Sequence, residues 1–319
     1  MINEVYKNRG LQVVEPAGII EATPIITEDL FNRFIAFVDA KPRTIETYTR
    51  AIRQLFNYFS FKGIRQPQRA DIIAFRDELK NDHKATTVQN YITATRLFFQ
   101  WTAQEGLYPN IADHIKGATI SKEHKKDYLT SKQVKAILNS IDRETIQGLR
   151  DYAILALMIT GGLRTIEVSR SNIEDLRAVG DSTALYIQGK GKDEKTEYIK
   201  IQPQVEEAIR DYLKALGITD QTQPLFTSTS NNSKGERLTT RSISGIVKKR
   251  LQEAGYNSDR LTAHSLRHTA VTLSLLGGNT LQEVQQFARH ANITTTQIYA
   301  HNLDRAKNKC ESTIAKAIF

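Results

Sequence analysis

The stretch from 262 to 301, TAHSLRHTAVTLSLLGGNTLQEVQQFARHANITTTQIYAH, carries the side chains around which the rest of the chain is organised. His264 and Arg267 lie three residues apart, and this spacing puts both on one face of a helix. A second histidine, His290, and a tyrosine, Tyr299, follow in the same stretch. Histidines, an arginine and a phenol together suit the attack of a hydroxyl on a phosphodiester without a metal.

The composition favours a polyanionic partner. The 319 residues are enough for two domains, the formal net charge is +9 and the pI is about 9.4. This balance puts DNA or RNA first, although many basic proteins bind nothing acidic. The single cysteine, Cys310, allows neither an internal disulfide nor a zinc cluster, and it fits a reducing cytosol.

No targeting or membrane segment is expected. The first residues, MINEVYKNRG, lack the charged and then apolar pattern of a signal peptide. The longest apolar run, around 153 to 159, is too short to span a bilayer. We therefore expect a cytoplasmic protein that does not enter a membrane.

The first part of the chain predicts a helical domain over 24–113, after a flexible lead-in over 1–23. Thr27 is a suitable N-cap for a first helix, and a second helix starts at Pro42 and ends at Gly63. Two more helices are predicted over Ala70–Leu79 and Thr86–Gln104, with aromatic residues on their apolar faces. The segment 114–127 is polar and basic, which indicates an interdomain linker. Its lysines could follow a phosphate backbone or be solvated.

The second part, 128–302, predicts an α-rich domain with a small antiparallel β-sheet. Thr130 or Ser131 caps a helix, and a strongly apolar helix over Leu149–Thr160 ends at a Gly-Gly pair. A period of two at 184–188 and 196–201 indicates two strands around a Gly-Lys-Gly turn. Further helices are predicted over Val205–Leu216, Arg241–Ala254, His264–Leu276 and Leu281–Phe287, so the fold class is mainly α with two domains.

Two basic residues upstream could complete a phosphate site. Arg164 follows the Gly-Gly pair, and Lys190 lies in the Gly-Lys-Gly turn. Taken alone, each residue has an ordinary interpretation. Arg164 would be a surface arginine or a partner of Glu167, and Lys190 would be a solvated lysine in a turn. Taken together with the stretch 262–301, the set gains weight, because guanidinium groups bind phosphate oxygens bidentately and a lysine can protonate a leaving oxygen. A carboxylate cluster with metal-ligand spacing and a P-loop are both absent from the sequence.

The order Arg, Lys, His-x-x-Arg, His, Tyr resembles the tyrosine recombinases, the integrase family that includes phage integrases and Xer recombinases. The resemblance rests on GLRTIEV (162–168), GKG (189–191), HSLRHT (264–269), RH (289–290) and TTQIYAH (295–301). It covers almost all of the second part and, more weakly, the first part, which resembles the helical core-binding domain of the family.

The resemblance implies a role for each of these residues. Arg164 and Arg267 match two phosphate-binding arginines, and Lys190 matches the general acid of the hairpin, with Lys192 as the alternative. His264 matches the residue that assists proton transfer at the tyrosine, and His290 matches a second phosphate contact. Tyr299 matches the nucleophile, and Glu167 matches an acidic residue that supports the site from behind. His268 is assigned a structural role, because it lies about 100° around the helix from Arg267.

The resemblance also implies a mechanism and an assembly. Tyr299 would form a 3′-phosphotyrosyl link with a free 5′-hydroxyl, and exchange through a Holliday junction would need a homotetramer on double-stranded DNA core sites, from protomers that are monomeric when free. No metal, ATP or other cofactor is implied. A tail helix over 303–319 would dock on a neighbouring protomer, with docking in cis as the alternative. Plausible DNA contacts in the first domain are Arg43, Arg50, Arg53 and Arg96, which could equally be solvated.

Two departures from the family pattern stand out. The family usually has Leu-Gly-His where this chain has Ala-Arg-His at 288–290, so the backbone or a local phosphate contact is expected to differ at Arg289. The lead-in over 1–23 is too short for an arm-binding domain, which favours a simple core-site recombinase.

Two other classes of protein compete with this interpretation. A type IB topoisomerase would use similar chemistry on one duplex, and a DNA-binding protein with a decayed site would lack one catalytic residue. Integration, excision and dimer resolution are the roles open to such a recombinase, with accessory direction-setting proteins as further partners. A prokaryotic, nucleoid-associated enzyme is the expected setting.

Overall fold

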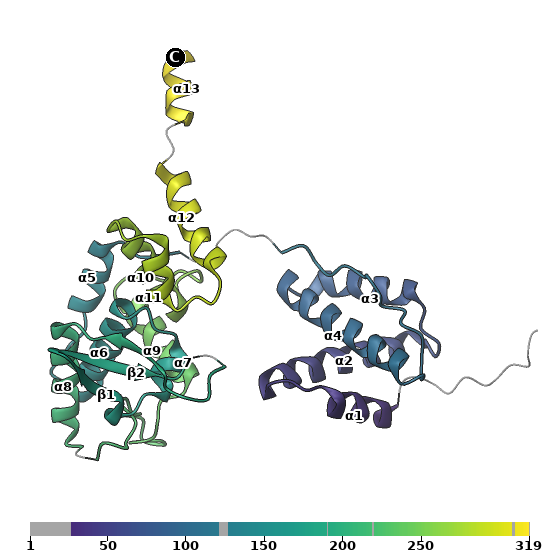
Figure 1. The fold of residues 1–319 in the computed structure, drawn as a ribbon, viewed down its shortest axis with the longest axis horizontal. Coiled ribbons are helices and arrows are strands. Elements are labelled where there is room, and N and C mark those ends of the chain that lie inside the picture. Colours follow the sequence, from purple (N-terminus) through teal and green to yellow (C-terminus); the bar gives the residue numbers. More distant parts are fainter. Residues whose placement is uncertain (1–26, 121–126, 190, 219, 308–309, 319) are drawn as a thin grey trace, which may run out of the picture. The chain divides into compact units, whose positions relative to one another are not determined.

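The computed structural model describes residues 27–120, 127–189, 191–218, 220–307 and 310–318 (Figure 1). The chain divides into two compact units, Met1–Lys122 and Glu123–Phe319. The expected lead-in over 1–23, most of the basic part of the linker, and Lys190 lie outside the described residues.

The described residues of the first unit form four helices, and the ends of these helices follow local sequence signals. They are α1 (Glu28–Phe37), α2 (Pro42–Lys62), α3 (Arg69–Asp82) and α4 (Ala85–Gln104). The Thr27 side chain caps α1 by accepting from the Leu30 N–H at 3.1 Å. Gly63 ends α2 in the left-handed conformation, with φ +66°, which costs glycine little. The predicted helix starts at Thr27 and Pro42 and the end at Gly63 are confirmed.

Aromatic rings fill the core of this unit. The ring of Phe98 on α4 lies 5.2 Å from that of Phe34 on α1 and 5.4 Å from that of Phe56 on α2, measured between centroids. Both pairs meet edge to face, which adds to the burial of their apolar area. Ile115 is buried in the same core, although the sequence placed it in the linker. The segment just after 113 therefore packs on the first unit.

The second unit is α-rich with one small sheet. Its elements are α5 (Ser131–Asn139), α6 (Ile146–Thr160), α7 (Thr165–Arg170), a 3-10 turn (Ile173–Asp175), β1 (Leu176–Val179), β2 (Ser182–Ile187), β3 (Glu197–Lys200), α8 (Pro203–Leu216), α9 (Thr240–Glu253), α10 (Ala263–Leu276), α11 (Leu281–Ala288), α12 (Ile293–Lys307) and α13 (Cys310–Ile318). The strands pair antiparallel in the order β1-β2-β3, with Leu185 opposite both Leu176 and Ile199. The predicted fold class is confirmed, whereas β1 and α12 were not predicted.

Helix α6 runs through the middle of the second unit. It packs against α8 and α10 (Figure 1). Ten of its fifteen residues are buried, among them the continuous run from Ala153 to Ile159. In Figure 1 the sheet and α8 lie at one end of this unit, and α10 to α12 at the other. The helix therefore joins the sheet to the elements that carry His264, Arg267, His290 and Tyr299.

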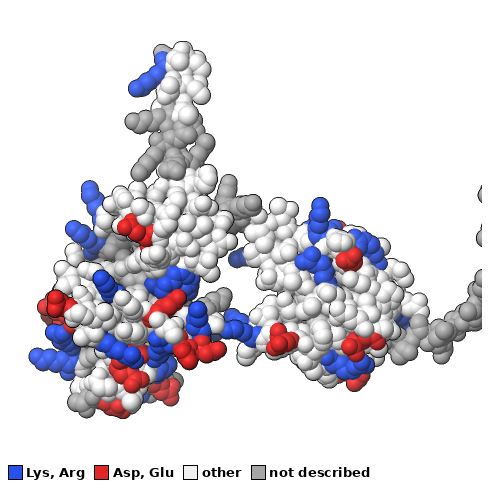
Figure 2. Space-filling model, in the orientation of Figure 1, with Lys and Arg blue, Asp and Glu red and all other residues white. Residues whose placement is uncertain are grey.

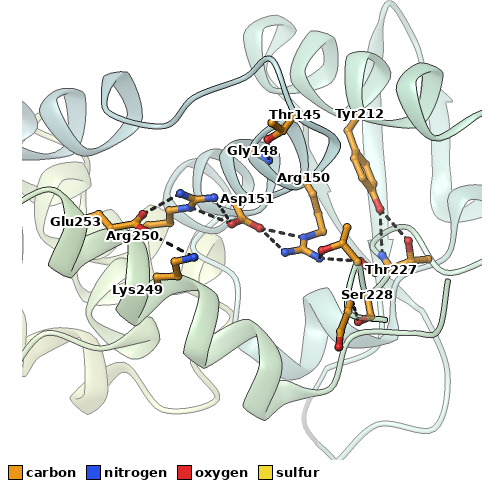
Figure 3. A network of polar contacts seen from close by, with 12 residues as sticks. Thr145, Gly148, Arg150, Asp151, Tyr212, Thr227, Ser228, Lys249, Arg250 and Glu253 are labelled. Atoms are coloured by element: carbon orange, nitrogen blue, oxygen red, sulfur yellow. Dashed lines mark hydrogen bonds and ion pairs between the residues drawn. The ribbon is translucent and has the colours of Figure 1, made fainter. Parts of the chain in front are cut away.

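A buried polar network fixes α6 to its neighbours (Figure 3). Asp151 accepts from Arg150 Nη2 at 2.7 Å and from Arg250 Nε of α9 at 2.9 Å. Arg150 also donates to the Thr227 carbonyl at 3.1 Å, and Arg250 donates to Glu253 at 2.8 Å. Each buried charge is thus paired and hydrogen-bonded, which is the condition for burying it.

Helix α12 differs most from the expected boundaries. It continues through Lys307, past the position 303 at which a separate tail was expected, and α13 follows from Cys310. It packs on α10 and α11, and Tyr299 enters a small apolar cluster with Val271 and Val284. Tertiary packing of this kind stabilises a helix that its threonine-rich start, ITTT, does not favour.

Candidate active site

The turn between α6 and α7 places Arg164. Gly162 in this turn has φ +57°, and a Cβ there would lie 3.0 Å from the Phe287 ring, so both the backbone and the space favour glycine. Arg164 precedes α7, and its N–H and Nη1 both donate to the Glu167 carboxylate at 2.8 Å. The Glu167 side chain is fully buried, whereas that of Arg164 is 28% exposed. Glu167 therefore holds Arg164 at both ends while the guanidinium stays accessible.

Arg267 on α10 is buried and reaches the same turn. Its Nη1 donates to the Gly162 carbonyl at 2.6 Å, and its Nη2 donates to the Ala288 carbonyl at the end of α11. Burial, then the nearby Arg164 and Arg289, lower the pKa of Arg267, although a guanidinium stays charged at neutral pH. The site thus keeps a charge that is only partly compensated.

Arg289 adds a third guanidinium. Its backbone is left-handed, with φ +53°, and its side chain turns inward rather than toward solvent. Its Nη2 donates to Glu167 Oε2 at 3.1 Å and to the Gly162 carbonyl at 3.2 Å. Whether this backbone departs from the family pattern stays a prediction, but the side chain binds a buried carboxylate. One carboxylate therefore faces three guanidinium groups, which favours an anion in the space between them.

A row of rings connects α10 to α12. The ring centroids of His264 and His268 lie 4.9 Å apart, as do those of His268 and Tyr299. The ring of His290 stacks on that of Tyr299 at 6.2 Å. Tyr299 is 5% exposed, and burial raises the pKa of its phenol, partly offset by Arg267 and Arg164. The phenol is therefore protonated at rest and needs a proton acceptor before it can attack.

His290 is held in its neutral form. Burial, with help from Arg267, Arg164 and Arg289, lowers the pKa of His290 to about 4. Its Nδ1 lies 2.9 Å from the hydroxyl oxygen of Thr296, which is buried on α12. When the hydroxyl donates to Nδ1, Nε2 carries the ring proton and can donate it to a ligand.

Two open clefts meet at Arg164. One, of about 650 Å³, is lined by Arg164, Ser244, Lys248 and His264 among others. The second, of about 830 Å³, is lined by Arg164, Lys192, Arg289 and His290 among others. A ligand that extends through both clefts would pass directly over Arg164.

The β2–β3 hairpin borders the second cleft. Lys190 at its turn lies outside the described residues, so its distance to the other site residues stays a prediction. The alternative, Lys192, is exposed and lines the cleft. The segment between β2 and β3 is anchored by Lys195, whose Nζ lies 2.5 Å from the buried Asp175 carboxylate.

The arginines expected to contact DNA lie on two helices of the first unit. Arg43, Arg50 and Arg53 lie on α2 and are exposed, and Arg96 on α4 is half-buried. Arg50 pairs with Glu46, and the Arg53 guanidinium lies 5.2 Å from the centre of the Phe31 ring. On the visible face of each unit, Lys and Arg are interspersed with Asp and Glu (Figure 2). On this face, surface charge alone does not therefore single out a binding patch.

Two residues at this site, His268 and Thr296, were not predicted to belong to it. The angle between His268 and Arg267 around the helix favoured a structural role for His268. His268 lies four residues after His264, however, and that spacing puts the two imidazole rings on one helix face. Thr296 gave no signal, because its contact depends on a helix that was not predicted. Among the described residues, no group of three or more His, Cys, Asp or Glu could hold a metal ion.

Comparison with known proteins gives one consistent family. A model described as "Phage integrase family" matches residues 127–306, and one described as "Phage integrase, N-terminal SAM-like domain" matches residues 29–108. The tyrosine recombinase XerC of Chlamydia muridarum is 30% identical over 263 residues, 82% of this chain and 79% of that protein. The tyrosine recombinase XerD of Listeria monocytogenes is 29% identical over 286 residues, 86% of this chain and 93% of that protein.

Solved structures of similar proteins share the fold. The XerH recombinase bound to a palindromic difH substrate, in a post-cleavage complex, matches with a TM-score of 0.70 and 22% identity over 85% of this chain and 80% of that one. A lambda integrase tetramer bound to a Holliday junction matches with a TM-score of 0.63 and 15% identity over 85% of this chain and 76% of that one. In the part of the chain that the structure describes, none of the helices combines the length and apolar character of a membrane span.

Proposed function

Because the chain belongs to the phage integrase family and is a tyrosine-type site-specific recombinase, we propose that it cuts and rejoins double-stranded DNA through a covalent bond to Tyr299. The observation that carries this proposal is that the charges of Arg164 and Arg267 act on the buried Tyr299 phenol, that His290 stacks on its ring, and that His264 is linked to it through the His268 ring. The clefts that meet at Arg164 give a phosphodiester strand a path to this group.

The cleavage step follows from the chemistry of these groups. The Tyr299 oxygen bonds to phosphorus, the bond from phosphorus to the 5′-oxygen breaks, and a 3′-phosphotyrosyl ester forms. The phenol proton passes to His264, and Lys190 gives a proton to the leaving 5′-oxygen. Arg164, Arg267 and neutral His290 bind the non-bridging oxygens, where charge grows in the transition state.

Rejoining reverses these steps with a new strand. The 5′-hydroxyl of a partner strand attacks the phosphotyrosyl ester and releases the phenol. Because the ester stores the bond energy, the exchange needs neither ATP nor an obligatory metal. Two cleavages on each of two duplexes require four protomers, and we propose a homotetramer on DNA that exchanges strands through a Holliday junction, with monomers in free solution.

Helix α13 provides a surface on which the protomers of this tetramer could contact one another. Ile314 and Ile318 on α13 are 58% and 68% exposed, and exposed apolar side chains on a terminal helix fit docking on a neighbouring protomer. Deletion of 310–319 removes α13 alone, since α12 ends at Lys307. We expect the deletion to spare DNA binding and cleavage on a single site and to impair strand exchange; unchanged exchange would contradict docking in trans.

The first unit would also bind the DNA core site. Arg43, Arg50, Arg53 and Arg96 are the proposed phosphate or groove contacts, and the lysines of 114–127 would follow the backbone between the units. Integration or excision of a mobile element, or resolution of a replicon, are the roles that fit such an enzyme. Direction-setting accessory proteins and a place at the nucleoid belong to the same proposal.

Covalent trapping tests the function. Wild type and Tyr299→Phe are incubated with nicked suicide duplexes that carry candidate attachment sequences, without metal, and separated on denaturing gels. An adduct in wild type alone supports the tyrosine mechanism. Tight binding to the same duplexes without any adduct would favour a DNA-binding protein instead.

A further inference from the structure

Arg289 adopts a backbone conformation that a side chain disfavours. Its φ of +53° lies in the left-handed region, which is unfavourable for a residue other than glycine. It ends α11 in this conformation, and its N–H donates to the Gln286 carbonyl at 3.0 Å. Glycine would meet the geometric need at lower cost. The side chain of Arg289 must therefore contribute something that the turn does not.

The side chain links three elements of the site. Its Nη1 donates to the Phe287 carbonyl at 2.8 Å, at the end of α11, and its Nη2 donates to the Gly162 carbonyl at 3.2 Å, in the turn before α7. The same Nη2 donates to Glu167 at 3.1 Å, on α7. The Gly162 carbonyl is also the acceptor of Arg267 Nη1. One buried guanidinium thus touches the supports of both Arg164 and Arg267.

We propose that Arg289 is a positioning residue that fixes the Glu167 carboxylate and, through it, aims the Arg164 guanidinium at the scissile phosphate. This inference rests on the proposed function, since it assigns Arg289 a part in the same phosphate site. Glu167 Oε1 accepts from Arg164 Nη1, and Oε2 accepts from the Arg164 N–H and from Arg289. Arg289 therefore holds the carboxylate plane in the one orientation that serves Arg164 at both ends.

The geometry favours this role over direct contact with DNA. The Arg289 side chain is 8% exposed, against 28% for Arg164, and its Nη donors already have protein acceptors. A phosphate-binding arginine contributes counterion release, so its loss lowers the salt dependence of DNA binding by about one ion. A positioning arginine leaves that dependence unchanged and alters the rate of the chemical step.

The test is a double-mutant cycle between Arg289 and Glu167. Single-turnover cleavage of a suicide duplex is measured at saturating protein for wild type, Arg289→Gly, Glu167→Gln and the double variant. We expect Arg289→Gly to cleave about ten-fold more slowly than wild type, within the range of couplings between contacting residues. In the Glu167→Gln background the same substitution should lower the cleavage rate very little, because the carboxylate that Arg289 binds has already been removed. Equal fold losses in both backgrounds would overturn the proposal.

Three controls separate the possible outcomes. Arg289→Lys keeps a charge with fewer fixed donors and should recover part of the rate. The salt dependence of binding should match wild type for Arg289→Gly; a slope lower by about one ion would assign Arg289 to direct phosphate contact instead. Melting temperatures show whether a loss of rate merely follows a loss of folded protein, which would also overturn the proposal. Wild type must form the Tyr299 adduct: without it the proposed function fails, whereas an adduct with an unaffected Arg289→Gly refutes only the inference.

Discussion

Asp151 and Glu167 are two buried carboxylates that each bind two guanidinium groups. Asp151 joins Arg150 and Arg250, with contacts of 2.7 Å to both (Figure 3). Glu167 joins Arg164 and Arg289, at 2.8 Å and 3.1 Å. By sequence and burial the two carboxylates look alike, yet the arginines around them are placed differently.

The two networks differ in how far their positive charges are balanced by carboxylates. Arg250 has a second carboxylate in Glu253, and Arg150 directs its other donors to Thr227 and Thr229, so that network is balanced and closed. Around Glu167 a third guanidinium, Arg267, adds charge without a carboxylate of its own, and Arg164 opens into two clefts. A balanced network stabilises a fold, whereas one with excess positive charge is prepared for an anion.

The largest expected effect is a loss of cleavage rate when the network around Glu167 is changed. Arg164→Gln removes an accessible charge from the proposed phosphate site, and loss of one such donor lowers cleavage by about 10²–10³-fold. The melting temperature should change little, because Arg289 still pairs with Glu167. Single-turnover cleavage and thermal unfolding by circular dichroism measure the two quantities. Cleavage by Arg164→Gln at the rate of wild type would remove the distinction.

The matched change in the other network should act on stability. Asp151→Asn leaves two buried guanidiniums facing a neutral amide, and breaking a buried pair lowers the free energy of unfolding by about 3–5 kcal/mol. Cleavage per folded molecule should stay at the level of wild type. Urea unfolding gives the stability, and active-site titration with the suicide duplex gives the folded fraction. A stable but inactive Asp151→Asn would mean that this network also serves catalysis.

A smaller effect is expected at His268. His268→Phe keeps an aromatic ring between His264 and Tyr299 but removes the ring nitrogens, and we expect cleavage to fall about ten-fold, the size of a coupling between residues in contact. The melting temperature should be kept, because Phe is apolar and of similar size. An unchanged rate would return His268 to a purely structural role.

The smallest effect concerns pH. The folded pKa of His290 is about 4, below its ordinary value of 6.5, so the unfolded chain takes up a proton first as pH falls. The contribution of neutral His290 to the stability of the folded state is therefore fully present above pH 6.5 and is lost progressively as the pH falls to 4. His290→Gln should flatten the decline in melting temperature within that window. An identical decline in both proteins would show that other groups cause it.

The sequence predicted most of the helices and strands, but few of the contacts that hold the site residues in place. Caps such as Thr27 and Gly63 and the apolar periodicity are local signals, so the helices they bound were predicted. β1 is only four residues long and half exposed, and α12 begins with residues that favour strands, so both depend on packing that the sequence does not display. The inward turn of Arg289 depends on the place of Glu167, more than a hundred residues earlier, and no local pattern encodes that contact.

The most direct measurement is the chemical identity of the covalent adduct. Wild type trapped on a suicide duplex is digested with nuclease and trypsin, and the nucleotide-bearing peptide is mapped by fragmentation mass spectrometry. We predict a phosphodiester on Tyr299 whose attached nucleotide is linked through its 3′-oxygen. A nucleotide on any other residue, or a link through the 5′-oxygen, would contradict the account of this site.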